Sequence, residues 1–259
     1  MLPLFHSLLI AQAAAGLVPL EQARLGLCLE QARTDPAAAI TEASTWLGEA
    51  GGAERSYPQQ CLGYAYTMLL RWDAAERAFL NARVLESGSA YVRRAQLATM
   101  AANAALAEER ADAALAALAL AATDAAAAGD AALRSVIETD RARALVLQGN
   151  QGEAEAVLAA ARTLDAQNSL AWLLSATLAR RLGKLDEAQG FIETAVALDP
   201  DHPEAGLEAG VIAMLQGRED AAKASWQSVI DIDPETVPAD IARGYLAQLA
   251  EPAADEAGE

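Results

Sequence analysis

Few side chains in this sequence could carry catalytic chemistry. The 259 residues include only two cysteines, Cys28 and Cys61, and two histidines, His6 and His202. A thiol oxidoreductase needs reactive cysteines close together in an electropositive setting. These two are far apart in the sequence, and no basic residue flanks Cys61. A thiol-dependent enzyme that uses Cys28 and Cys61 is therefore only a remote alternative.

The histidines add little to the catalytic possibilities. His202 lies in an acidic, proline-containing turn at residues 199–203, and turn residues of this kind are usually solvated caps. The sequence has no glycine-rich phosphate loop, no His-Glu-x2-His motif and no Ser/His/Asp set. Two histidines also leave most hydrolase mechanisms without a base. We expect a protein that is not an enzyme and has no cofactor and no metal site.

The elements that would position any functional site follow a repeat with a period of 34 residues. The motif Leu198-Asp199-Pro200 recurs as Ile232-Asp233-Pro234. At the same interval, a glycine recurs between the two halves of each repeat, at residues 149, 183 and 217. A fixed period of this size is the signature of a solenoid built from helix pairs.

The composition predicts that the chain is all-α. Apolar residues make up 53% of the sequence and aromatic residues only 5%, and many of the apolar residues are alanines. Alanine has the highest helix propensity. No segment alternates Val, Ile or Thr with polar residues between turn signals, as a strand would.

One helix pair carries a more specific motif. Leu62-Gly63-x2-Tyr66 is followed on the next helix by Ala75-x3-Phe79. Together they resemble the tetratricopeptide repeat, in which small residues sit where paired helices cross and aromatic residues fill the space around the crossing. The resemblance implies a right-handed superhelical α-solenoid of stacked antiparallel helix pairs with a C-terminal capping helix. It also implies a scaffold or adaptor that binds a protein or peptide.

We expect this solenoid to occupy residues 19–250. The expected units are 19–52, 56–87, 90–128, 135–168, 169–202 and 203–236, with a capping helix at 238–250. Solenoids need such a terminal cap because the last repeat would otherwise expose its apolar face. Residues 251–259 are acidic and are expected to form a disordered tail.

Residues 1–18 are interpreted as a signal peptide or, alternatively, as an uncleaved N-terminal helix. They contain no Asp, Glu, Lys or Arg, and a short apolar run ends in small residues with a natural cleavage site after Ala13. A signal would place the protein in the periplasm or elsewhere outside the cytoplasm of a bacterium. An uncleaved helix would indicate a cytoplasmic assembly factor. The run is too short and interrupted for a membrane span, so membrane association is not expected after signal removal.

The net charge narrows the range of partners. With 36 acidic and 19 basic residues, the formal net charge is −17. Recognition of nucleic acid depends on Lys and Arg that neutralise phosphates, so we exclude a nucleic-acid partner. No motif indicates a small-molecule substrate. A protein or peptide of unknown identity remains the expected partner.

The resemblance also implies where a partner would bind. In tetratricopeptide proteins, ligand peptides usually lie on the concave surface lined by the first helix of each pair. Transferred by helix phase, the protein-binding groove would be lined by Tyr57, Gln60, Tyr64, Gln96, Thr99, Asn103, Thr139 and Arg143. The Lys/Asn/Arg set with which chaperone-binding relatives hold a C-terminal carboxylate is not reproduced, so a chaperone co-factor is not expected.

The resemblance bears on the two cysteines as well. Cys28 and Cys61 are each expected on the first helix of adjacent units, and such helices lie side by side in this architecture. A disulfide between them is one expectation if the chain is exported. The alternative is two buried cysteines that act as small hydrophobic side chains.

Overall fold

A computed structural model describes residues 20–250, which contain thirteen α-helices, one short 3-10 helix and no strand. The helices follow one another as antiparallel pairs. The pairs are α1 (Leu20–Thr34) with α2 (Pro36–Glu49), α3 (Ser56–Met68) with α4 (Trp72–Leu85), α5 (Tyr91–Ala107) with α6 (Ala111–Ala128), α7 (Ala131–Leu147) with α8 (Gln151–Leu164), α9 (Ser169–Arg181) with α10 (Leu185–Leu198), and α11 (Pro203–Leu215) with α12 (Glu219–Ile232). A last helix, α13 (Val237–Ala250), packs on α11 and α12, and η1 (Gly52–Arg55) precedes α3. The expected signal segment at 1–18 and acidic tail at 251–259 lie outside the described residues.

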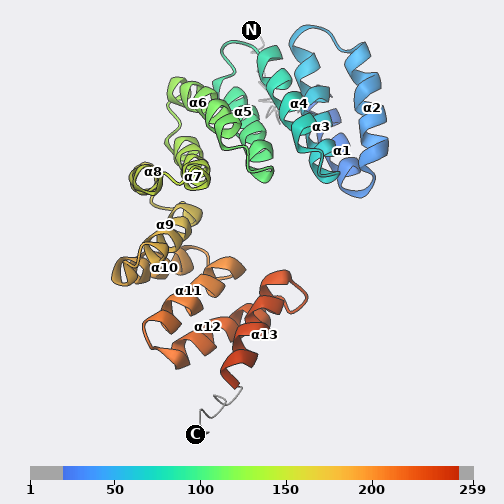
Figure 1. The fold of residues 1–259 in the computed structure, drawn as a ribbon. Coiled ribbons are helices and arrows are strands. Elements are labelled where there is room, and N and C mark those ends of the chain that lie inside the picture. The colour runs from blue at the N-terminus through green and yellow to red at the C-terminus, as the bar shows by residue number, and fades with distance from the viewer. Residues whose placement is uncertain (1–19, 251–259) are drawn as a thin grey trace, which may run out of the picture.

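The pairs stack one on another into a curved array (Figure 1). Within this array the first helices of successive pairs contact each other, as α5 with α7, α7 with α9 and α9 with α11. No contact of similar extent joins successive second helices among the described residues. The first helices are therefore closer together and line the inner side of the curve. The prediction of an all-α solenoid of stacked helix pairs is confirmed.

The turns within five of the pairs share one backbone conformation. Each turn has three residues, and the middle one has a positive φ: Leu70, Glu109, Gly149, Gly183 and Gly217. In every case the next residue donates its N–H to a carbonyl five residues earlier, which is the closing bond of a Schellman motif. Glycine adopts a positive φ without steric cost, so the recurring glycines mark the three regular turns.

The core depends on small residues at the helix crossings. Ala75 is fully buried, and Phe79 of α4 lies over Gly63 of α3, where a Cβ atom would approach the phenyl ring to 2.5 Å. In the following pair, Ala114 and Leu118 of α6 are buried in the same arrangement of a small and then a large residue. This close fit explains why the alanine-rich sequence forms pairs of helices.

One helix begins earlier than the repeat predicts. The regular repeat was expected from Ser135, but α7 begins at Ala131, because Asp130 caps it by accepting a hydrogen bond from the N–H of Leu133 at 2.9 Å.

Helix α6 is long and apolar enough to cross a membrane by length and composition alone. It packs between α5 and α7 and contributes Leu118 to the core, and buried core helices commonly meet that criterion.

Candidate protein-binding groove

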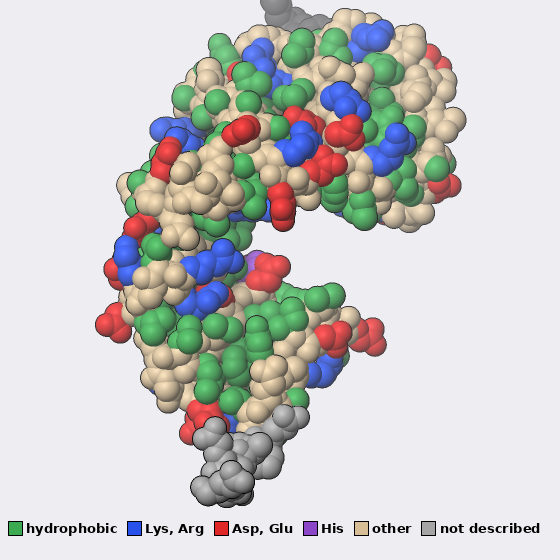
Figure 2. All heavy atoms as spheres, viewed as in Figure 1, with side chains coloured by type: hydrophobic (Ala, Val, Ile, Leu, Met, Phe, Trp, Pro, Cys, Tyr) green, Lys and Arg blue, Asp and Glu red, His purple; other side chains and the backbone are tan. Residues whose placement is uncertain are grey.

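A pocket of about 330 Å³ opens between three first helices, at the C-terminal ends of α5, α7 and α9. Figure 2 shows the inner side of the array as a deep hollow between the N-terminal and C-terminal halves, with hydrophobic side chains on its lower wall. The pocket is within the range of volumes found for ligand sites in proteins. It is therefore the strongest candidate for the part of the groove that holds a ligand.

The wall of the pocket is mainly apolar. It is formed by aliphatic side chains from each of the three first helices, namely Leu106, Val146, Leu147, Leu174 and Leu178. Leu106 and Leu178 are buried and belong to the core, whereas Leu147 is 45% exposed. Because Leu147 is apolar and incompletely buried, covering it with a ligand side chain would remove further apolar surface from water.

One polar group in the pocket is held in place by a network. The terminal guanidinium nitrogen Nη1 of Arg143 donates to Oδ1 of Asn103 at 2.8 Å and to Oδ1 of Asp140 at 2.9 Å. Asn103 in turn donates to the other carboxylate oxygen of Asp140, at 2.8 Å. Both contacts of Arg143 use the same nitrogen, and its side chain is 44% exposed. The rest of the guanidinium group can therefore meet a ligand in a fixed orientation.

Two further charged residues lie at the edges of the pocket. Glu109 belongs to the turn after α5, and Arg181 is the last residue of α9. Neither side chain forms an ion pair or a side-chain hydrogen bond within residues 20–250, unlike neighbouring Arg180, which pairs with Glu208 at 2.6 Å. The pocket therefore has an acidic edge at α5 and a basic edge at α9, with α7 between them.

Three residues expected in the groove are instead buried. Thr139 is 1% exposed; its hydroxyl donates to the carbonyl of Ser135 at 2.8 Å and accepts from the amide of Asn168 at 3.2 Å. Thr99 and Gln60 are 8% and 9% exposed. The hydroxyl of Thr99 donates to the carbonyl of Ala95 in its own helix at 2.9 Å, and Oε1 of Gln60 has no hydrogen-bond partner among the described residues. Because so little of each of the three side chains is exposed, the expectation that they contact a ligand is corrected.

The aromatic residues expected in the groove are engaged within the N-terminal pairs. Tyr57 is half-buried, with the guanidinium of Arg93 lying 4.3 Å from its ring centroid. The hydroxyl of Tyr64 accepts a hydrogen bond from Nε of Arg33 at 3.2 Å. Gln96 is exposed but does not line the pocket. Of the eight expected residues, Arg143 lines the pocket and Asn103 supports it.

The apolar part of the site was not expected from the sequence. Leu147, Leu174 and Thr177 line the pocket together with Arg181, and none of them was proposed. One signal was present: Leu147 is an apolar residue in the last turn of a first helix, two residues before the repeat glycine at 149. A position that the core does not need but that keeps an apolar side chain is a candidate for a binding surface.

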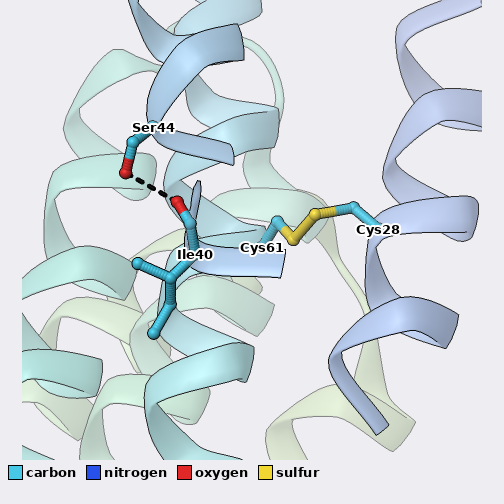
Figure 3. The surroundings of a disulfide bond; sticks show 4 residues. All are labelled: Cys28, Ile40, Ser44 and Cys61. Carbon is cyan, nitrogen blue, oxygen red and sulfur yellow. Dashed lines mark hydrogen bonds between the residues drawn. A yellow bond between two sulfur atoms is a disulfide. The ribbon is translucent and has the colours of Figure 1, made fainter. Parts of the chain in front are cut away.

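The two cysteines form a disulfide that joins the first helices of the two N-terminal pairs. Figure 3 shows the bond between Cys28 of α1 and Cys61 of α3, whose Cα atoms are 6.1 Å apart. Both side chains are buried, at 1% and 0% exposure, and the chain has no other cysteine. Neither sulfur is therefore available as a nucleophile while the bond is present. Among residues 20–250, no three His, Cys, Asp or Glu side chains are grouped to hold a metal ion.

Comparison with known proteins identifies the repeat. Residues 170–202, which span most of α9 and all of α10, match the family model of the tetratricopeptide repeat. A comparison with curated proteins finds no match. The match to one repeat, together with the fold, confirms the resemblance stated from the sequence motifs.

Several solved structures have similar folds. A thermophilic tetratricopeptide-repeat protein from Thermus thermophilus is 20% identical and superposes with a TM-score of 0.60, over 75% of this chain and 98% of that chain. PilF from Pseudomonas aeruginosa is 14% identical with a TM-score of 0.65, over 88% of this chain and 97% of that chain. The quorum sensor NprR from B. thuringiensis, in its apo form, is 12% identical with a TM-score of 0.67, over 93% of this chain and 74% of that chain. At these identities the likeness shows the fold alone.

Proposed function

Since one repeat matches the tetratricopeptide model and the described helices stack in pairs, we propose that the chain is a non-catalytic scaffold that binds an extended peptide segment of a partner protein along its inner face. The observation that carries this proposal is the pocket between α5, α7 and α9. It combines an apolar wall with Arg143, which is already oriented by Asp140 and Asn103. An apolar pocket with a few positioned polar groups is the usual form of a binding site.

The position of the pocket favours a peptide over a compact ligand. It crosses three consecutive first helices, so a chain laid across it would contact three repeats in turn. Solenoids present extended concave surfaces of this kind because each repeat adds a similar helix to the inner side. The aliphatic side chains, including Leu147 and Leu174, would hold one anchoring side chain of the partner, and such buried anchors carry most of the binding free energy in protein interfaces.

The test begins with peptides selected from a displayed library of random sequences on the purified protein. The affinities of the selected peptides are then measured for the wild type and for Leu147→Glu, which places a charge in the apolar wall. The matched control is Leu120→Glu, because Leu120 of α6 is similarly exposed, at 40%, and does not line the pocket. We expect Leu147→Glu to weaken binding at least about tenfold, since burying an unpaired charge is costly. Leu120→Glu should have little effect.

Folding is followed in the same variants so that a loss of binding can be assigned to the pocket. Both leucines are partly exposed, and thermal melts of the two variants should resemble that of the wild type. Selected peptides that bind Leu147→Glu as tightly as the wild type would contradict the groove assignment. A library that yields no ligand would contradict the proposed function itself.

The cellular compartment of the protein is a separate part of the proposal. Export to an oxidising compartment such as the bacterial periplasm is supported by the buried pairing of Cys28 with Cys61 and by the uncharged, apolar sequence of residues 1–18. The alternative is a cytoplasmic assembly factor that keeps these residues as a helix. N-terminal sequencing of the protein from its native host separates the two. A mature chain that starts at Ala14 supports export, and one that starts at Met1 contradicts it.

A further inference from the structure

Most charged side chains near the pocket are neutralised within the protein. Arg143 is paired with Asp140, and Arg180 with Glu208. On the other side of the pocket, Arg110 pairs with Glu76 at 2.6 Å. In each of these pairs a charged side chain already has a partner of opposite sign within residues 20–250.

Glu109 and Arg181 are the exceptions. Both line the pocket, and neither has a charged partner within residues 20–250. They have opposite signs and lie on opposite sides of α7, because Glu109 follows α5 and Arg181 ends α9. A ligand that crosses the pocket from α5 to α9 therefore meets a negative charge, then an apolar wall, and then a positive charge.

We propose that the pocket selects a peptide segment in which an apolar side chain lies between a basic residue and an acidic residue. The basic residue pairs with Glu109, the apolar side chain enters the space beside Leu147 and Leu174, and the acidic residue pairs with Arg181. This inference rests on the proposed peptide-binding function and specifies the chemistry of the partner. It follows from complementarity of charge, which in interfaces contributes more to specificity than to affinity.

The geometry of the array also sets the spacing between the two charges. Packed helices lie about 8–10 Å apart, so the step from α5 across α7 to α9 is roughly 16–20 Å. An extended chain rises about 3.3 Å per residue, so the two charged residues of the ligand should be about five or six positions apart. A capped hexapeptide with the sequence Lys-Ser-Leu-Leu-Ser-Asp meets both requirements.

The experiment changes the charge at one edge of the pocket at a time. Three hexapeptides with neutral, capped ends share the central Ser-Leu-Leu-Ser and carry Lys and Asp, two Lys, or two Asp at their ends. Their binding is measured by fluorescence anisotropy to the wild type, to Arg181→Glu, and to Glu109→Lys. Both protein residues are at the surface, and Glu109→Lys keeps an ordinary side chain at a turn position whose φ is 55°. Arg134→Glu, in the first turn of α7 at the far end from the pocket, is the control for net charge.

The wild type should prefer the peptide with one Lys and one Asp by about 2- to 5-fold per matched charge, as expected for exposed ion pairs. Arg181→Glu should instead prefer the peptide with two Lys, and Glu109→Lys the peptide with two Asp. Arg134→Glu should keep the preference of the wild type. Each preference should shrink as salt is added, because the charges are exposed.

Failure of this inference can be told apart from failure of the proposed function. If library-selected peptides lose affinity for Leu147→Glu but the three hexapeptides show the same order of affinity for every protein, the groove binds peptides and the charge rule is wrong. The rule is also wrong if Arg134→Glu changes the preference as much as Arg181→Glu does. If the selected peptides do not depend on Leu147, the groove assignment fails and this inference fails with it, whereas a library that yields no ligand means that the proposed function itself fails.

Discussion

The indole ring of Trp226 lies against the backbone of Gly210, so closely that a Cβ atom on the glycine would approach Nε1 of the indole to 2.1 Å. The indole nitrogen donates to the carbonyl of Leu207 at 3.2 Å, and Tyr245 of α13 packs on the other part of the ring, with centroids 4.9 Å apart. One glycine thus allows three helices to meet around a single tryptophan.

The first prediction concerns this crossing. Gly210→Ala should destabilise the protein by about 1–3 kcal/mol, because the added methyl group overpacks a filled core. The matched control is Gly190→Ala in α10, where nothing lies within 4 Å of an added Cβ atom. That change should stabilise the protein by about 0.5–1 kcal/mol, since alanine is favoured over glycine within a helix. Denaturant unfolding of both variants measures the difference, and equal effects would mean that the crossing is placed wrongly.

The second prediction concerns the disulfide between Cys28 and Cys61. Replacing both cysteines by alanine should lower the stability of the N-terminal pairs by about 3–4 kcal/mol, as the chain-entropy model gives for a loop of this length. Hydrogen exchange in α1 measures the loss directly. A reductant should reproduce it in the wild type and change nothing in the double variant. Unchanged protection of α1 after reduction would show that packing alone holds this helix.

The third prediction concerns a buried acidic residue. The carboxylate of Asp124 is 5% exposed and pairs with Arg83 at 2.7 Å and with Arg94 at 3.2 Å. Asp124→Ala should cost about 3–5 kcal/mol, because it leaves buried positive charge without a partner. Chemical denaturation of this variant is the measurement. A loss well below this range would mean that water reaches the two arginines once the carboxylate is gone.

Asp73 provides the exposed counterpart for that experiment. Arg77 donates a hydrogen bond to its carboxylate at 2.7 Å, and this bond lowers the pKa of Asp73. A carboxylate with a lowered pKa stabilises the folded state above its unfolded pKa, and the contribution is lost as the pH falls through the lowered value. Because the pair is exposed to solvent, Asp73→Ala should change the unfolding midpoint far less than Asp124→Ala.

The fourth prediction separates structural residues of the inner helices from binding residues. Thr139→Val removes the hydroxyl that joins Ser135 and Asn168, and should cost about 1 kcal/mol of stability. It should leave the affinity for selected peptides unchanged, because Thr139 is buried away from the pocket. Arg143→Ala should weaken peptide binding, and it should also lower the melting temperature, because it leaves the buried carboxylate of Asp140 with Asn103 as its remaining partner. A clear loss of peptide affinity in Thr139→Val would show that Thr139 does contribute to peptide binding.

The architecture could be predicted because local and periodic features of the sequence, the turn glycines and the small residues at helix crossings, determine it. The glycines at 149, 183 and 217 mark turns with a positive φ, and Gly63 and Ala75 mark the close crossing of two helices. Packing within a helix pair was harder to foresee. At Gly206 the sequence lacks the aromatic residue found at Trp172, which suggests looser packing, yet Val229 fills this space to within 2.5 Å of where a Cβ would lie.

The candidate site could be predicted only in part, because the position of a residue around its helix does not show whether its side chain is buried in the core. Thr99 and Thr139 occupy inner positions but are buried by their own and neighbouring helices. Arg143 remains accessible because Asp140 and Asn103 hold it at the edge of the pocket. The contact of Arg143 with Asn103 joins separate helices, so it depends on the angle between successive pairs, which a single sequence does not reveal.

The bond between Cys28 and Cys61 has a mechanical consequence. Under tension applied at its two ends, the molecule can lengthen only where the chain is not closed on itself, so helices beyond α3 would unravel while the 33-residue loop stayed short. Reducing the disulfide while the molecule is under tension would let the 33-residue loop extend in one step. An optical trap would record it as an extra extension that appears only in the presence of a reductant.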